Sequence, residues 1–365
     1  MRLAITGLGL VTSVGHDART ACASIRAGMQ RPRELTYYSI LDLEEQESKP
    51  LTGRPVHGYS DGFTGTGLWL RLALGAAEDM LGGATLPQTS NSTFWARTGL
   101  CVATPDLAPG RYDEDDRLRA ESVRQTFLAP LVNALGWSAP PSSHHIISVG
   151  HTGAIEAIDL AGQMIARQEW DRAVIVCVDS YVDLLSLEWL DAADRLKTED
   201  NPNGLIAGEA GACFMVETVQ TAAERSAQPL ALLEGWTVTP AVTRPLSDQP
   251  VTGEALATAL RETLAHLQIE RFDGLAIGDL NGESWRSQDW GSALVRLGPL
   301  MTDRVEWWFP CDSLGETGAA SAAIAICLGA TALARGYVPG GAVLISASGE
   351  SGAAACALLS PGAAG

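Results

Sequence analysis

The chain is poor in basic residues: 25 lysines and arginines stand against 43 aspartates and glutamates, which gives a net charge of -18. Nucleic acids and anionic membranes bind surfaces that are cationic. We therefore expect neither a nucleic acid nor a membrane as the main partner, although a local basic patch is compatible with this balance. The low share of charged residues, 19% against 46% apolar residues, also excludes a largely disordered chain.

The chain lacks the cysteine spacing of a disulfide framework or a zinc site. Its seven cysteines are an odd number spread from Cys22 to Cys356, with no C-x-x-C pair. The acidic run at 113–116 fits no calcium-loop template. We expect free thiols, buried where they lie in apolar strand patterns as at Cys177 and Cys213, and neither a metal nor a cofactor.

The chain also lacks an apolar run that is long and charge-free enough to cross a membrane. Residues 319–334 come closest, and their many alanines and glycines favour a helix packed in the core. The apolar N-terminus is broken by Gly7 and Gly9 before any cleavage-site pattern, which indicates a first strand and turn and not a signal peptide. We expect a soluble, cytoplasmic protein.

One short phrase occurs twice, as Gly150-His151-Thr152-Gly153-Ala154 and as Gly315-Glu316-Thr317-Gly318-Ala319. Each copy is followed by a small-residue helical pattern and then by an apolar run of strand type, which indicates an internal duplication. The alternation of strands and helices predicts an α/β fold with sheets covered by helices. We expect an N-terminal half at 1–225, with an irregular insertion at about 31–116, and a C-terminal half at 226–365.

Four segments in order resemble the β-ketoacyl synthase family of the thiolase superfamily. The opening at 5–15 is similar to the family's first strand and turn. The segment at 204–212 is similar to G-F-V-x-G-E-G-A-G, that at 313–317 to S-x-x-G-H-T, and that at 349–352 to G-F-G-G. The resemblance implies the thiolase fold, in which duplicated halves form layers in the order αβαβα.

The resemblance also implies where a ketosynthase site would lie. In that family a cysteine at the start of the first repeated helix takes up the acyl group, and two histidines assist it. The cysteine position falls on Gly150, and the two histidine positions fall on Asp279 and Glu316. Glycine cannot be acylated, and a carboxylate cannot donate the hydrogen bonds that stabilise a developing enolate. The chain therefore resembles a degenerate member, for which we do not expect Claisen condensation.

Two other residues are candidates for chemistry. His151, with Asp279 and Glu316 nearby, resembles a base with acids in reach, while the alternative is that it lines a helix start. Cys311, at the position of the family's lysine, is a candidate nucleophile or a thiol without function. The family's aromatic gate falls on Glu350. Only His151 and Cys311 therefore leave room for an unusual acyl-thioester enzyme that works without the cysteine.

The function that the resemblance implies is that of a catalytically inactive scaffold, adaptor or chaperone, of the kind encoded beside type VI secretion effectors. The alternative is a partner of an active ketosynthase, similar to the chain-length factors. The family forms dimers by strand pairing across a two-fold axis, which implies a homodimer in addition to the protein partner. The strand expected at this interface consists of Ala173, Val174, Ile175, Val176, Cys177 and Val178.

Overall fold

The helices and strands are those of a computed structural model that describes all residues except 43–45, 85, 108–110, 113–120 and 363–365. The acidic run at 113–116 lies outside the described residues. The strands of the main sheet are β1 (Leu3–Thr12), β4 (Thr98–Thr104), β5 (His144–Ser148), β6 (Arg172–Ser180), β7 (Glu209–Thr218), β8 (Ala231–Thr239), β9 (Leu275–Ile277), β10 (Glu306–Trp308), β11 (Val343–Ser348) and β12 (Ala354–Pro361). The helices are α1 (Ala18–Arg26), α2 (Gly65–Gly83), α3 (Ser92–Trp95), α5 (Ala129–Leu135), α6 (Gly153–Ala166), α7 (Leu184–Ala192), α8 (Val219–Glu224), α9 (Glu254–His266), α10 (Ser284–Leu297), α11 (Cys311–Leu314) and α12 (Ser321–Ala334).

The strand order repeats itself, as the duplicated sequence predicts. The sheet runs β10-β9-β11-β12-β8-β1-β7-β6-β4-β5, and its two groups of five strands have the same arrangement. In each group three neighbouring strands are parallel and the last two pairings are antiparallel. Among the described strands, only the short pairing of Leu3–Ile5 with Ala231–Leu233 joins the groups. The exact division at residues 225 and 226 remains a prediction.

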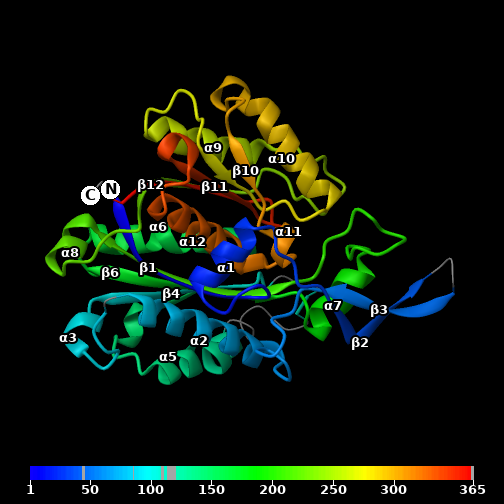
Figure 1. Cartoon of the computed structure of the whole chain (residues 1–365), viewed down its shortest axis with the longest axis horizontal. Coiled ribbons are helices and arrows are strands. Elements are labelled where there is room, and N and C mark those ends of the chain that lie inside the picture. The colour runs from blue at the N-terminus through cyan, green and yellow to red at the C-terminus, as the bar shows by residue number, and fades with distance from the viewer. Residues whose placement is uncertain (43–45, 85, 108–110, 113–120, 363–365) are drawn as a thin grey trace.

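The two groups of strands enclose a central layer of helices (Figure 1). Helices α6 and α12 lie between the groups, α2, α3 and α5 cover the outer face of the first group, and α9 and α10 cover the outer face of the second. Three apolar clusters fill the spaces between these layers. The predicted α/β thiolase fold, with duplicated halves in αβαβα order, is confirmed.

Helix α12 forms the centre of the molecule because it is apolar on every side. Nearly all of its residues are buried, and half of them are alanine or glycine, so the flanking strands approach it closely. This is the segment in which the sequence predicts a core helix. Among the described helices, none combines the length and the apolar character that are needed to cross a membrane.

The irregular insertion expected at about 31–116 contains a two-stranded hairpin near its start, so the prediction is wrong there. Strands β2 (Arg33–Asp42) and β3 (Glu47–Gly53) form an antiparallel hairpin outside the main sheet, and α2, α3 and β4 follow it. A lone two-stranded hairpin is marginal in water. This one is held by tertiary contacts with α7 and the segment before it, since the hydroxyl of Tyr37 donates to the Val182 carbonyl and that of Tyr38 to Asp191. A local sequence pattern does not reveal such contacts.

The expected dimer strand at 173–178 does not lie at an edge of the sheet. It belongs to β6, which pairs with β4 on one side and with β7 on the other. All nine residues of β6 are buried. Because both rows of backbone groups are already used, β6 cannot pair with a second chain, and the assignment of Ala173–Val178 to a dimer interface is wrong. In the described part of the chain, the strand with a free edge in this half is β5.

Close packing between β1 and α2 predicts that Gly9→Ala is strongly destabilising. A Cβ on Gly9 would lie 1.9 Å from the Ala76 carbonyl oxygen and 2.6 Å from the Met80 nitrogen, both backbone atoms that cannot turn away. We expect urea unfolding to show a loss of about 3 kcal/mol or more. The control Gly291→Ala in α10 meets no atom within 4 Å and should stabilise by up to about 1 kcal/mol. Equal effects of both changes would contradict this packing.

Candidate functional site

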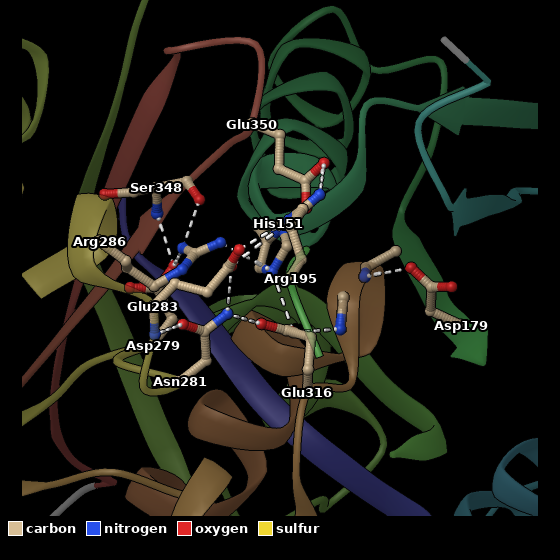
Figure 2. A network of polar contacts seen from close by, with 12 residues as sticks. His151, Asp179, Arg195, Asp279, Asn281, Glu283, Arg286, Glu316, Ser348 and Glu350 are labelled. Atoms are coloured by element: carbon tan, nitrogen blue, oxygen red, sulfur yellow. Dashed lines mark hydrogen bonds and ion pairs between the residues drawn. The ribbon is translucent and has the colours of Figure 1, made fainter. Parts of the chain in front are cut away.

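The two copies of the repeated phrase meet at the centre of the molecule. They form the short turns Gly150–Thr152 and Gly318–Ala320, which lead into α6 and α12. The first glycine of each copy has a left-handed backbone, with φ of 67° at Gly150 and 70° at Gly315. The residues that follow these glycines, His151 and Glu316, face each other across the junction of the halves, with 3.0 Å between Nε2 and Oε1 (Figure 2).

Glu316 is a buried carboxylate whose two oxygens are both bonded. Oε1 accepts from the backbone N–H of Gly318 at 2.7 Å, and Oε2 accepts from Nδ2 of Asn281 at 2.6 Å. Burial by itself raises the pKa of a carboxyl group. Here His151, Arg286 and the Gly318 N–H overcome that effect and hold the pKa of Glu316 well below its usual range. The side chain is therefore an anion that already has its partners.

His151 is only 2% exposed. Burial lowers the pKa of its imidazole, but the Glu316 carboxylate more than offsets this and raises the pKa above its ordinary value. In the protonated form Nε2 donates to Glu316. Nη2 of Arg286 also lies 3.2 Å from this nitrogen, but a protonated Nε2 has no lone pair and cannot accept a hydrogen bond from it. The neighbouring carboxylates must therefore balance two adjacent cations.

Arg286 is the second cation of the site and comes from the first turn of α10. Its NH1 donates to Oδ2 of Asp279 at 2.6 Å and to the Ser348 carbonyl at 2.7 Å. The same Asp279 oxygen accepts the backbone N–H of Ser348 at 2.7 Å. The guanidinium also lies 4.4 Å from the ring centre of Trp285. Arg286 thereby ties the ends of β9 and β11 to the His151–Glu316 pair.

Arg195 is a third cation and bridges two carboxylates. It donates to both oxygens of Glu283, at 2.7 and 3.0 Å, and to both oxygens of Glu350, at 2.7 and 3.3 Å. Burial would raise the pKa of Glu350, but Arg195 holds it below its usual value. The three side chains come from the loop after α7, the start of α10 and the loop between β11 and β12. The guanidinium of Arg195 thus joins three separate segments next to His151 (Figure 2).

A further buried pair lies at the start of α12. Arg111 donates to Oδ1 of Asp179 at 2.7 Å, while Oδ2 of Asp179 accepts the N–H of Ala319 at 3.0 Å. Burial outweighs the effect of Arg111 and raises the pKa of Asp179. The amides at this helix end are therefore bonded to two carboxylates of the chain, Asp179 and Glu316.

A cavity of about 260 Å³ opens beside this network. Gly150, His151, Tyr181, Trp189 and Glu350 are among the residues that line it. A Cβ built on Gly150 would find no atom nearer than 3.6 Å, so a side chain has space at this position, but the left-handed backbone would strain any residue other than glycine. The position that resembles that of the nucleophile thus borders a cavity but carries no reacting group.

The structure brings together most of the predicted site residues. The polar network contains His151, Asp279 and Glu316, as the motif positions predict. Gly150 borders this network and lines the cavity. Cys311 at the start of α11 is partly exposed, yet burial of its thiol raises its pKa well above the ordinary value. Because the thiolate is the reactive form, the structure argues against Cys311 as a nucleophile.

Sequence reasoning missed Arg195, Asn281, Glu283 and Arg286. The available signal was the presence of carboxylates at three positions of the motifs, Asp279, Glu316 and Glu350. Carboxylates that are buried together need cations and donors close by. Nothing in local spacing shows which arginines supply them, since Arg195 and Glu350 are 155 positions apart.

Comparisons with known proteins support the fold and leave the family open. No protein-family model and no curated protein matches the chain. A Streptomyces albus JA3453 oxazolomycin ketosynthase domain matches with a TM-score of 0.77 and 15% identity, over 100% of this chain and 76% of that one. A structure of a type II PKS acyl-carrier protein in complex with its ketosynthase matches with a TM-score of 0.74 and 18% identity, over 99% of both chains. The ishigamide ketosynthase/chain length factor matches with 0.73 and 15%, again over 99% of both. The chain therefore has the fold of ketosynthases.

The buried charges predict that Arg286→Met is severely destabilising. The change keeps most of the volume but leaves Asp279 without its cation, and breaking a buried pair on one side costs about 3–5 kcal/mol. Urea unfolding should show this loss, and the double variant Arg286→Met/Asp279→Asn should lose less than the two single changes together. The control Arg304→Met, at an exposed position, should change stability by less than about 0.5 kcal/mol. If Arg286→Met lowered the free energy of unfolding by less than about 1 kcal/mol, Asp279 would not depend on Arg286 as its buried cation.

The His151–Glu316 pair also predicts a pH dependence of stability. The stabilisation from His151 is complete below its ordinary pKa of 6.5 and is lost as the pH rises through the raised pKa of the folded protein. The stabilisation from Glu316 is complete above its ordinary pKa of 4.5 and is lost as the pH falls through the lowered one. In Glu316→Gln, burial and Arg286 should favour neutral His151, so stability should rise with pH up to about 6.5. The measurement is the free energy of unfolding at pH 5–9 in the wild type and in Glu316→Gln. The same dependence on pH in both proteins would contradict the proposed coupling between His151 and Glu316.

Proposed function

We propose that this chain is a catalytically inactive protein of ketosynthase fold that serves as a scaffold, adaptor or chaperone for another protein. The observation that carries the proposal is the buried His151–Glu316 pair, which joins the two positions where the fold begins its central helices. At the position of the acylated cysteine stands Gly150, which has no nucleophile to offer.

The electrostatics of the site argue against condensation as well. Stabilising an enolate requires hydrogen-bond donors directed at the developing negative charge. Asp279 and Glu316 present acceptors there, and the nearby cations His151 and Arg286 are already bonded to them. A substrate anion that entered the site would be repelled by these carboxylates, and the hydrogen-bond donors of the site are already bonded to them. The same contacts argue against His151 as the base of an unusual thioester enzyme, since its Nε2 is held by Glu316.

The segments around the cavity support a binding role. Arg195 fastens the loop that carries Glu350, and a fixed charged pair there suits a site that keeps its shape and does not open for a substrate. The cavity of about 260 Å³ is small for a long acyl chain. We propose a partner in the cytoplasm, namely a type VI secretion effector, on the basis of the resemblance and the absence of a catalytic set at the positions that correspond to the family's.

A chain-length-factor-like role is the second candidate. It is favoured by the comparison with the ishigamide ketosynthase/chain length factor, which covers 99% of both chains. In this role the chain would pair with an active ketosynthase. Affinity capture from the native cell separates the two candidates, because one predicts a ketosynthase and the other an effector as the stoichiometric partner.

We further propose a homodimer, with β5 as its interface strand in place of β6. In the described part of the chain β5 pairs only with β4, so its other edge is free. All five residues of β5 are half-buried. A second copy of β5 across a two-fold axis would continue the sheet and cover this edge, which otherwise invites unspecific pairing.

The first prediction from this proposal concerns chemistry. The wild-type protein should consume neither malonyl nor acetyl thioesters above a protein-free control, as measured by release of carbon dioxide and free thiol. Gly150→Cys should stay inactive, because Asp279 and Glu316 still accept where donors are needed. Thioester turnover by the wild type that disappears in His151→Ala would overturn the assignment as inactive.

The second prediction concerns the dimer. Light scattering at micromolar concentration should give twice the mass of one chain, and Ile146→Lys in β5 should give monomers, since a charge on an edge strand opposes pairing. The control Val295→Lys replaces the apolar residue of α10 that is 83% exposed and should remain dimeric. Circular dichroism checks that both variants are folded. A monomeric wild type, or a dimer that survives Ile146→Lys, would contradict the β5 interface.

A further inference from the structure

A groove of about 1020 Å³ lies at the C-terminal end of α12. It is formed where β1, α1 and the end of α2 meet the segment after α8 and the end of α12. Helix α12 has 14 residues, so at a rise of about 1.5 Å per residue the groove is roughly 20 Å from the network at the helix start. The groove is therefore separate from the candidate site and from its cavity.

The groove is locally basic although the chain has a net charge of -18. The charged residues that line it are Arg19, Arg26, Arg225, Arg335, Asp17 and Asp79. Arg225 is committed to the buried carboxylate of Glu217, to which its Nε donates at 3.0 and 3.1 Å. The remaining three arginines are the positive charge that the groove offers to a partner.

These three arginines are placed to bind an anion from outside. Arg19 and Arg335 are exposed and form no ion pair within the described part of the chain. Arg26 lies 4.0 Å above the ring of Tyr337, which fixes its guanidinium at the rim without neutralising it. Guanidinium groups bind carboxylates with two parallel hydrogen bonds, so such a set favours carboxylate partners.

The two aspartates of the groove are already bonded by backbone amides. Asp17 caps α1 by accepting the N–H of Thr20 at 2.8 Å. Asp79 accepts the N–H of Leu10 at 3.0 Å and that of Ala18 at 2.7 Å. Backbone dipoles thus partly offset their negative charge, and Asp17 also attracts Arg19 electrostatically. Four arginines against two aspartates still leave the lining of the groove with an excess of positive charge.

The floor of the groove leaves space for a main chain. A Cβ placed on Gly82 or Gly83 would meet no atom within 4 Å, so the surface over the end of α2 is open. Strand β8 pairs with β1 only over Leu3–Ile5, and Thr6–Leu8 beyond that pairing border the groove. An open floor of small residues beneath charged rims suits an extended segment better than a compact ligand.

We propose that this groove binds an extended acidic segment of another protein. The overall charge of the chain repels acidic partners, so an acidic segment that binds must do so where arginines locally reverse the potential. Charge complementarity with Arg19, Arg26 and Arg335 selects the segment, and the open floor accommodates its backbone. This surface would give the chain a way to engage a partner that does not depend on the former catalytic position.

The test is a titration of the full chain with a fluorescein-labelled octaglutamate peptide, followed by anisotropy at about 50 mM salt. We expect saturable binding that weakens at least tenfold in Arg19→Ser/Arg335→Ser and falls as the salt concentration rises. The control Arg271→Ser/Arg304→Ser removes the same charge from exposed arginines outside the groove and should bind as the wild type does.

Three results would overturn the proposal. One is that octaglutamate does not bind, or binds the groove variant as tightly as the wild type. Another is that inorganic pyrophosphate binds and octaglutamate does not, which would make the groove a small-anion site. The third is that the wild type self-associates at low salt and Arg19→Ser/Arg335→Ser does not, which would make a second copy the occupant.

Discussion

The contact between His151 and Glu316 is the interaction on which the centre of this molecule depends. The two residues stand at the same place in the two copies of one repeated phrase, so the duplication itself brings them face to face. Both are almost completely buried. A buried ion pair is stable only if its remaining donors and acceptors are satisfied. Arg286, Asp279 and Asn281 meet that requirement from α10 and the segment before it.

The same constraint explains why the site holds its own anions. The N-termini of central helices carry free amides and a partial positive charge, which is a suitable environment for an anionic group. In this chain the carboxylates of Glu316 and Asp179 accept the amides at the start of α12. The partial positive charge at this helix start is therefore taken up by two side chains of the chain itself. The charges of this network thereby stabilise the resting structure.

Exposed arginines line the groove at the other end of α12. Near the site, Arg111, Arg195 and Arg286 are all neutralised by buried carboxylates. At the groove, Arg19 and Arg335 face solvent. The buried arginines thus maintain the structure of the site, whereas the arginines of the groove are open to solvent.

Much of the fold is readable in the sequence, because strands and core helices have local signatures. The repeated phrase predicts the duplicated halves, the aspartate at position 17 predicts the cap of α1, and the alanine-rich run predicts the central helix. The absence of a side chain at Gly150 is likewise visible in the residues alone. The charge compensation of the buried carboxylates is not visible there, since it depends on Arg195 and Arg286, which reach them only through the fold. In the same way, pairing on both sides made β6 an interior strand, and contacts with α7 and its neighbouring segment ordered the β2–β3 hairpin. Periodicity and capping act between near neighbours in sequence, whereas charge balance and strand position arise between residues that only tertiary structure brings together.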